Sequence, residues 1–276
     1  MEAQCKSCGA PQTSRYCPEC GEQRLTPKLR SVGYILRDLF KDITEVDGKV
    51  WLTLRKLLFS PGSIDRDFWE GRRKIYMRPI TLFLLINVLF VMFSSLSDFY
   101  VNFYSQRDLQ QYSQWVTPHL MSYIDSQGWD VKDFAAHYDQ MVKVLARSLI
   151  ILQVPIFALF VALICRKKGF FSGDFVTFSL NFHSLFLILF LVIGYPDLLI
   201  RAINNLEVLP FNIPYIKFTI LQAGMLIYLF FAMRRLFGFS NWQTLWRLPF
   251  VVIAYFLSHI IYRFLQLIIT TSMIEL

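Results

Sequence analysis

The sequence predicts an all-α integral membrane protein, in which a five-helix transmembrane bundle follows a small N-terminal domain. Three observations support this fold class. The 276 residues are 55% hydrophobic and 17% charged, whereas soluble domains are usually about 45–50% apolar and about 25% charged. Long uncharged runs are missing from residues 1–78 but dominate from Pro79 onward. Four of the five cysteines lie within the first twenty residues, which sets this segment apart from the rest of the chain.

The first element is the cysteine-rich segment CKSCGAPQTSRYCPECGE, residues 5–22. Its cysteines follow the spacing C-x2-C-x8-C-x2-C, and Gly9 and Gly21 follow the second cysteine of each pair. Glycine permits the tight turn that points backbone N–H groups at sulfur, and four thiolates suit a tetrahedral Zn²⁺ ion. Residues 1–24 are therefore interpreted as a cytosolic zinc ribbon. One structural Zn²⁺ per chain is expected on Cys5, Cys8, Cys17 and Cys20.

A redox dithiol and an iron–sulfur cluster are the alternatives for these cysteines. A redox pair needs only one Cys-x-x-Cys, usually at a helix start in a larger fold, so two pairs in a short segment favour zinc. A closed four-cysteine site leaves no open coordination position, and it is therefore expected to be structural rather than catalytic. Cys165 is expected to be a small apolar residue at the inner end of a span.

Residues 25–78 are predicted to form cytosolic amphipathic helices and a basic junction. Apolar residues recur at helical spacing over residues 29–46, and a second helix ends at Phe59, before the turn Ser60-Pro61-Gly62. These helices are expected either on the inner leaflet, where anionic lipid attracts basic residues, or on the protein's own cytosolic ends. The junction is interpreted as a topology anchor or as a patch for phospholipid phosphates or an acidic partner. The patch residues are Arg72, Arg73, Lys74, Tyr76 and Arg78.

Residues 79–276 are expected to form the transmembrane domain, because they contain five apolar segments of spanning length, about 17–25 residues. The segments are residues 79–97, 144–165, 175–194, 213–233 and 248–270. Basic clusters lie beside alternate ends of these segments, which the positive-inside rule places in the cytoplasm. The N-terminus is therefore expected inside and the C-terminus outside. The net charge of +8 is explained by these clusters, so no nucleic acid partner is expected.

Two loops are predicted outside the cytoplasm. Residues 98–143 are net acidic and rich in aromatics, with amphipathic helices expected at Ser105–Trp115 and Val131–Lys143. This loop is interpreted either as a helical layer on the membrane surface or as a cap that binds a ligand or partner. Residues 195–212 are predicted to form an interfacial helix.

Few polar residues lie within the predicted spans, and such residues are functional candidates by default. Asn87, Arg147, Gln153 and Gln222 are among the polar residues of the spans, and the possible intramembrane polar site comprises Asn181, His183, His259 and Arg263. It is interpreted as a helix-packing network or as a path for a substrate or a proton. The predicted spans contain no Asp or Glu, which weakens a proton-coupled transporter. Familiar hydrolase, metalloprotease and nucleotide-binding motifs are missing, so no catalytic residues are predicted and an enzyme is not expected.

The paired Cys-x-x-Cys-Gly segment and the junction TLRKLLFSPGSIDRDFWEGRRKIYMRP together resemble a family of uncharacterised bacterial inner-membrane proteins. This is the domain of unknown function numbered three-six-six-seven. The matching junction positions are Thr53, Leu54, Leu57, Leu58, Pro61, Gly62, Gly71, Arg73, Tyr76 and Pro79. The resemblance implies a zinc ribbon, several spans and the bacterial inner (cytoplasmic) membrane, and it implies no known activity. The five spans are also loosely similar to Yip1-type membrane proteins, an architectural analogy of little functional weight.

Two non-enzymatic functions are left open by the sequence, and a membrane enzyme acting on a lipid or cell-envelope substrate, for which no nucleophile or carboxylate pair is visible, is a third. The first is a membrane-embedded adaptor or assembly protein, whose ribbon and amphipathic helices bind a cytosolic protein partner. The second is a small transporter or lipid-handling protein that uses the polar residues in the spans, with residues 98–143 as a lid. The lipid bilayer is an expected partner in both cases, and the oligomeric state is left open.

Overall fold

The computed structural model describes residues 3–24, 49–93, 100–204 and 213–274. The chain divides into two compact units: residues 1–93 with 157–253, and residues 94–156 with 254–276. The helix predicted over residues 29–46 lies outside the described part of the chain.

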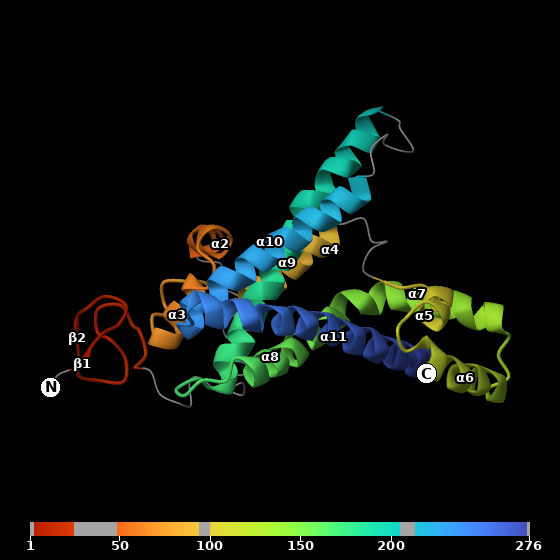
Figure 1. Ribbon diagram of the computed structural model, residues 1–276, viewed down its shortest axis with the longest axis horizontal. Helices are drawn as coiled ribbons and strands as arrows, with labels where there is room; N and C mark the ends of the chain where they lie inside the picture. The colour runs from red at the N-terminus through yellow and green to blue at the C-terminus, as the bar shows by residue number, and fades with distance from the viewer. Residues whose placement is uncertain (1–2, 25–48, 94–99, 205–212, 275–276) are drawn as a thin grey trace. The chain divides into compact units, whose positions relative to one another are not determined.

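The first unit begins with a two-stranded antiparallel sheet, formed by β1 (Ala3–Gln4) and β2 (Pro11–Gln12) (Figure 1). The helices α2 (Lys49–Phe59) and α3 (Ser63–Glu70) follow. The predicted helix ending at Phe59 is thus confirmed as α2. The turn between α2 and α3 places Gly62 at φ 71°, in the left-handed region that glycine adopts readily.

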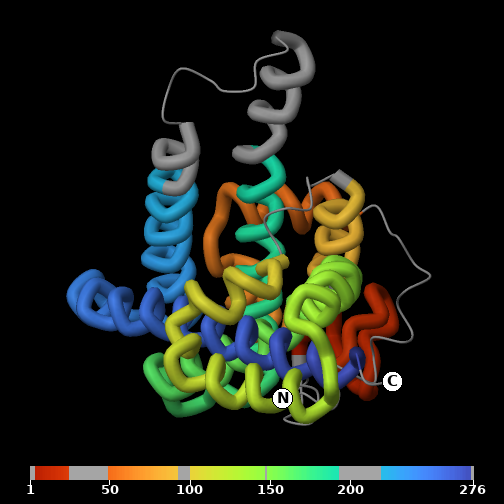
Figure 2. Tube along the Cα trace, turned by 90° about the vertical axis from the view of Figure 1, so that its right-hand side faces the viewer, coloured from red at the N-terminus to blue at the C-terminus, as the bar shows by residue number. Residues whose placement is uncertain are grey.

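Long helices make up the rest of the first unit. They are α4 (Pro79–Phe93), the end of α8 (Gln153–Ile164), α9 (Ser172–Asn204), α10 (Ile213–Phe237) and the first part of α11 (Asn241–Ile274). Figure 2 shows α9 between α4 and α10. Buried apolar side chains fill this packing, among them Leu82, Phe83, Phe157, Phe178, Phe182, Leu229 and Phe237.

Within the described part of the chain, three helices are long and apolar enough to cross a membrane, in agreement with a membrane protein. Their candidate segments are Ser172–Val192, Thr219–Phe237 and Asn241–Ile274. They overlap the third and fourth predicted spans and contain the fifth. The first predicted span corresponds to α4, a shorter apolar helix that begins at Pro79, where the missing proline N–H does no harm.

The second predicted span, residues 144–165, is not one continuous helix. The helix α7 (Val131–Leu149) ends in the 3₁₀ helix η3 (Ile150–Leu152), and α8 begins at Gln153. Pro155 lacks an N–H for the carbonyl four residues before it, so the sequence favours a break at this point. The α7–α8 pair is a fourth candidate span only if both helices are counted together. The predicted helix Val131–Lys143 is confirmed within α7.

The interfacial helix predicted over residues 195–212 is wrong as a separate element. The helix α9 continues without interruption to Asn204, and residues 205–212 lie outside the described part. Pro196 removes one backbone donor, but it does not end the helix. A long apolar helix therefore carries the chain past the expected boundary.

The second unit packs α5 (Phe103–Asp108), α6 (Ser113–Ser126) and α7 with the last part of α11. The helix predicted over Ser105–Trp115 is wrong, because residues 109–112 form a turn between α5 and α6. Asn102 starts α5 early, since its side chain accepts a hydrogen bond from the Ser105 N–H. The buried core of this unit consists of Phe103, Leu120, Ile124, Phe134, Ala135, Tyr138, Val142 and Leu267.

Candidate metal centre and buried polar sites

The four predicted ligands come together at the N-terminus. The sulfurs of Cys5, Cys8, Cys17 and Cys20 lie within 4.8 Å of one another. Cys5 Sγ lies 3.5 Å from Cys20 Sγ, and Cys8 Sγ lies 3.6 Å from Cys17 Sγ. A disulfide would need about 2.05 Å, whereas a tetrahedral zinc ion with Zn–S bonds of about 2.3 Å separates its sulfurs by about 3.8 Å. The cluster therefore fits a metal ion.

The glycines that follow each pair take the expected role. Gly9 has φ 78° and donates its N–H to the Cys5 carbonyl, and Gly21 has φ 68° and donates to the Cys17 carbonyl, both at 2.9 Å. These turns direct other backbone N–H groups toward sulfur. Such a bond from the Cys20 N–H is the main cause that lowers the pKa of Cys17 to about 7, and it favours the thiolate that a metal requires.

Glu22 joins this cysteine segment to the junction. Its side chain is buried, and Oε2 accepts hydrogen bonds from the backbone N–H of Arg73 at 3.0 Å and of Lys74 at 2.7 Å. The Ser7 hydroxyl donates to the same oxygen at 2.7 Å. One carboxylate thus satisfies three donors, two of which belong to a loop more than fifty residues further along the chain.

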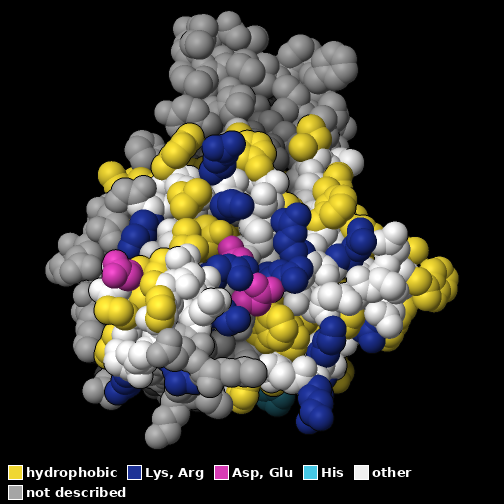
Figure 3. Space-filling model, turned by 90° about the vertical axis from the view of Figure 1, so that its left-hand side faces the viewer, with side chains coloured by type: hydrophobic (Ala, Val, Ile, Leu, Met, Phe, Trp, Pro, Cys, Tyr) yellow, Lys and Arg dark blue, Asp and Glu magenta, His cyan; other side chains and the backbone are white. Residues whose placement is uncertain are grey.

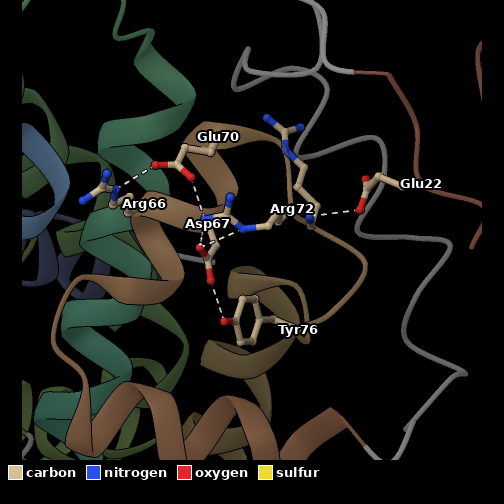
Figure 4. A network of polar contacts seen from close by, with 7 residues as sticks. Glu22, Arg66, Asp67, Glu70, Arg72 and Tyr76 are labelled. Carbon is tan, nitrogen blue, oxygen red and sulfur yellow. Dashed lines mark hydrogen bonds and ion pairs between the residues drawn. The ribbon is translucent and has the colours of Figure 1, made fainter. Parts of the chain in front are cut away.

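A polar network holds the junction behind this contact (Figure 4). Tyr76 donates its hydroxyl to Asp67 Oδ2 at 2.6 Å, and Arg72 Nε donates to Asp67 Oδ1 at 3.0 Å. Glu70 pairs with Arg72 at 2.6 Å and with Arg66 at 2.7 Å. The pKa of Glu70 is lowered, mainly by the Arg66 hydrogen bond. These contacts hold α3 and the loop that follows it in one network of polar side chains.

The side chains of the predicted junction patch are therefore partly buried in the protein and partly exposed on its surface. Tyr76 is buried rather than placed at headgroup level, and Arg72 is paired with acidic residues of α3. Arg73 uses its Nε to donate to the Phe68 carbonyl at 3.3 Å. Lys74 is exposed, and Arg78 is partly exposed. Binding of lipid or an acidic partner by this patch stays a prediction.

Several residues behind the family resemblance have structural roles. Thr53 Oγ1 accepts a hydrogen bond from the Met77 N–H at 2.9 Å and ties α2 to the junction. Leu57 is 1% exposed. A Cβ atom added to Gly62 would lie 2.6 Å from the Ala232 carbonyl oxygen, so only glycine lets this turn approach α10.

Asn181 has an acidic partner that sequence reasoning missed. Its Nδ2 donates to Asp65 Oδ1 at 2.7 Å, which links α9 to α3, and both side chains are buried. Tyr228 of α10 is close enough to Asp65 for an electrostatic interaction. The carboxylate went unnoticed because Asp65 lies in the short helix α3, outside every apolar segment. The buried amide was the available signal, since a buried polar group needs a partner.

The environment of Asp65 disfavours its charge. The pKa of Asp65 is raised to about 7. Burial is the largest cause of this rise, and the Asn181 hydrogen bond opposes it with a smaller lowering effect. Among the described residues, Asn181 Oδ1 and Ser63 Oγ are buried without a hydrogen-bond partner. Asp65 is thus a protonatable group in the interior of the first unit, where α3, α9 and α10 meet.

The four predicted intramembrane polar residues fall into different units. Asn181 and His183 lie in the first unit, and His183 packs at the edge of the Phe157 and Phe182 rings. His259 and Arg263 lie in the second unit. Arg263 Nε donates to His259 Nε2 at 3.3 Å, and Arg263 Nη1 donates to Gln266 Oε1 at 3.1 Å. Each pair therefore has its own local partners.

Helix ends that carry basic residues meet on one face of the first unit. Lys167 donates to the Phe237 carbonyl, and the Trp69 and Phe170 rings stack at 5.0 Å. These contacts join α3 and the end of α10 to the segment that connects α8 with α9. Figure 3 shows a face with many Lys and Arg side chains and few acidic ones. Exposed members of this set in the first unit are Arg55, Arg66, Lys74, Arg166, Lys167, Lys168 and Arg235.

Comparison with known proteins gives one match. A model of the family described as "Protein of unknown function (DUF3667)" matches residues 47–91. This range spans α2, α3, the loop between α3 and α4, and most of α4. The match covers Asp65, Asp67, Arg72 and Tyr76, whereas the cysteine segment lies outside it. No curated protein and no solved structure matches the chain. Over residues 47–91, the chain is similar to a family whose function is unknown.

Proposed function

We propose that this protein is a membrane-embedded adaptor that holds a zinc ribbon at a fixed position on the cytosolic face and presents it to a protein partner. The observation that carries the proposal is the contact of Glu22 with the Arg73 and Lys74 amides. A ribbon attached only by a flexible linker could sample many orientations. Buried, charge-assisted hydrogen bonds limit this freedom and hold one surface of the ribbon against the junction.

The donor set supports zinc as the ion. Four cysteine sulfurs in a closed cluster match structural zinc sites, and they leave no position for a substrate. A bound Zn²⁺ would link the two cysteine pairs and replace the apolar core that so short a segment cannot build. Cys5 and Cys17 are buried, and the turns after each pair already have the required conformation.

The basic face supports a cytosolic ribbon. Cationic helix ends are characteristic of the cytoplasmic side of a membrane protein, and here they come from α2, α3, α8 and α10. The junction that holds Glu22 belongs to the same set, through Lys74. We infer five crossings, with α4 and the α7–α8 pair joining the three long helices. This arrangement places the N-terminus inside and the C-terminus outside, and the family resemblance suggests the bacterial inner membrane.

The exposed side of the ribbon is the proposed partner surface. Thr13, Ser14, Arg15 and Tyr16 are all exposed, and the Tyr16 side chain has 52% of its surface accessible. Tyrosine and arginine contribute more than most residues to protein–protein contacts. Arg15 lies over the Tyr16 ring at 5.7 Å, so the two side chains form a compact feature. This loop connects the two cysteine pairs and depends on the metal site for its shape.

The test is affinity capture of the full chain from its native membrane in mild detergent, with three variants compared. Cys17→Ser removes a metal ligand, Tyr16→Ala alters the exposed loop, and Glu19→Ala changes an exposed charge on the same segment. An adaptor loses the same protein partner in Cys17→Ser and Tyr16→Ala, retains it in Glu19→Ala, and keeps its metal in Tyr16→Ala. A set of captured proteins that is identical across all variants would contradict the proposal.

A further inference from the structure

A pocket of about 460 Å³ lies in the second unit, away from the cysteine cluster in sequence. It is lined by Val101, Gln110, Gln111, Phe256, His259, Ile260 and Arg263. The size is within the range of about 300–1,000 Å³ that is typical of small-molecule sites. Two kinds of side chain line it: polar groups that include one cation, and apolar groups.

The wall formed by α11 follows from helical spacing. Phe256, His259, Ile260 and Arg263 recur at intervals of three and four residues, so they share one face of the helix. The opposite wall comes from the turn between α5 and α6, with Gln110 and Gln111, and from Val101 just before α5. The early end of α5, which the sequence did not predict, is therefore what places two glutamine side chains at the pocket.

A hydrogen-bond network supports the Arg263 wall. Buried Gln106 donates from Nε2 to the Arg263 carbonyl at 2.8 Å, and the same amide contacts Tyr112 Oη at 2.6 Å. The guanidinium donates to His259 Nε2 and to Gln266 Oε1, an imidazole nitrogen and an amide oxygen. These bonds fix the orientation of Arg263 in a helix turn where only 8% of the residue is exposed.

The chemistry of the lining selects an anion. Arginine stays protonated in proteins and presents a planar set of donors that matches carboxylate and phosphate oxygens. Gln110 and Gln111 add amide donors at the opposite wall. Phe256, Ile260 and Val101 supply apolar surface for a hydrocarbon portion. A purely inorganic ion would leave this apolar part without contact.

We propose that this pocket binds an amphiphilic anion, with its phosphate or carboxylate group at Arg263 and its apolar portion against Phe256, Ile260 and Val101. Two sources offer this chemistry. One is an anionic phospholipid that enters headgroup first, and the other is a soluble alkyl phosphate. The pocket lies in the second unit and the cysteine cluster in the first, so this proposal can fail while the adaptor proposal stands, and the reverse.

The test is native mass spectrometry of the full chain in mild detergent, with three probes: phosphatidylglycerol, phosphatidylcholine and octyl phosphate. Arg263→Gln removes the charge, and Arg263→Lys retains it. Arg247→Gln is the matched control, because Arg247 lies on the same helix, stacks on Trp246 and does not line the pocket. Val101→Trp fills the pocket without changing charge, with Val101→Ala as its partner control. Thermal unfolding checks that each variant is folded.

Arg263→Gln and Val101→Trp are expected to weaken binding of the anionic probe about tenfold or more. Arg247→Gln is expected to leave binding unchanged, Val101→Ala to weaken it only slightly because it removes part of one apolar contact, and Arg263→Lys to be intermediate. This pattern for phosphatidylglycerol, with little binding of phosphatidylcholine, identifies a lipid. The same pattern for octyl phosphate alone identifies a soluble anion. If Arg263→Gln does not fold, Val101→Trp against Val101→Ala decides the matter. Equal binding in wild type and Val101→Trp, or no binding of either anionic probe, would overturn the proposal.

Discussion

Lys74 donates its backbone N–H to Glu22 Oε2 at 2.7 Å, across 52 positions of sequence. The contact connects the cysteine segment, which lies outside the family match, to the junction, which lies inside it. Because Glu22 also follows the second cysteine pair by two residues, a change in the turn at Cys17 and Cys20 is expected to displace the carboxylate. The cysteine cluster and the junction are thus linked through the Glu22 side chain.

Replacing Glu22 by alanine is expected to release the ribbon from the junction while leaving its metal in place. The Arg73 and Lys74 amides lose a charged acceptor, whose hydrogen bonds are worth roughly 1.5–3 kcal/mol. Hydrogen exchange at these two amides is therefore expected to accelerate about ten- to a hundredfold. Glu19→Ala is the matched control, because Glu19 is exposed in the same segment. Unchanged exchange in Glu22→Ala would show that the contact does not hold the ribbon.

Replacing Asp65 by asparagine is expected to reduce the pH dependence of stability. Asp65 has a pKa of about 7 when folded, against an ordinary value of 3.8, so the folded protein holds its proton more tightly than the unfolded chain. Stability is then lost as the pH rises from about 4 to about 7. A shift of this size corresponds to roughly 4 kcal/mol at most.

The measurement for Asp65 is the Tm in detergent at pH 5 and at pH 8. Wild type is expected to lose more stability than Asp65→Asn over this interval, and the two are expected to be closer at pH 5. Asp133→Asn, which neutralises an exposed carboxylate of α7, is expected to follow wild type. Parallel pH profiles for wild type and Asp65→Asn would mean that Asp65 does not change its charge in this range.

Local patterns in the sequence predicted much of the structure. The four cysteines and their glycines predicted the cysteine cluster, since ligand spacing and turn conformation are both local. Hydropathy predicted the three long helices, and helical spacing predicted α2 and most of α7. The resemblance was correct for the junction that the family model matches.

Features that depend on tertiary contacts were not predicted. Asp65 lies in the short helix α3, outside the apolar segments. Only its contact with Asn181 of α9 in the folded chain shows that it is buried. Tyr76 suggested a headgroup position, but Asp67 draws its hydroxyl inward. The Gln110–Gln111 turn ends α5 early, and the break near Pro155 follows from a missing backbone N–H; hydropathy records neither.

Replacing Gly62 by alanine is expected to separate the α2–α3 turn from α10. Two effects lower the free energy of unfolding. The left-handed backbone costs any residue other than glycine roughly 1–2 kcal/mol, and overlap of the new Cβ with the Ala232 backbone costs roughly a further 1–3 kcal/mol. Gly128→Ala isolates the first cost, because Gly128 has φ 70° and open space around its Cα. Chemical denaturation is expected to show a larger loss for Gly62→Ala, and equal losses would argue against close packing at Ala232.

The most direct test of the adaptor proposal is native mass spectrometry of the full chain extracted in mild detergent, with metal analysis on the same sample. One zinc per chain and a protein partner in fixed stoichiometry are expected. Cys17→Ser is expected to lose both, and Tyr16→Ala only the partner. A fully reduced preparation without metal, or a chain with zinc whose associated proteins are unaffected by either substitution, would contradict the account.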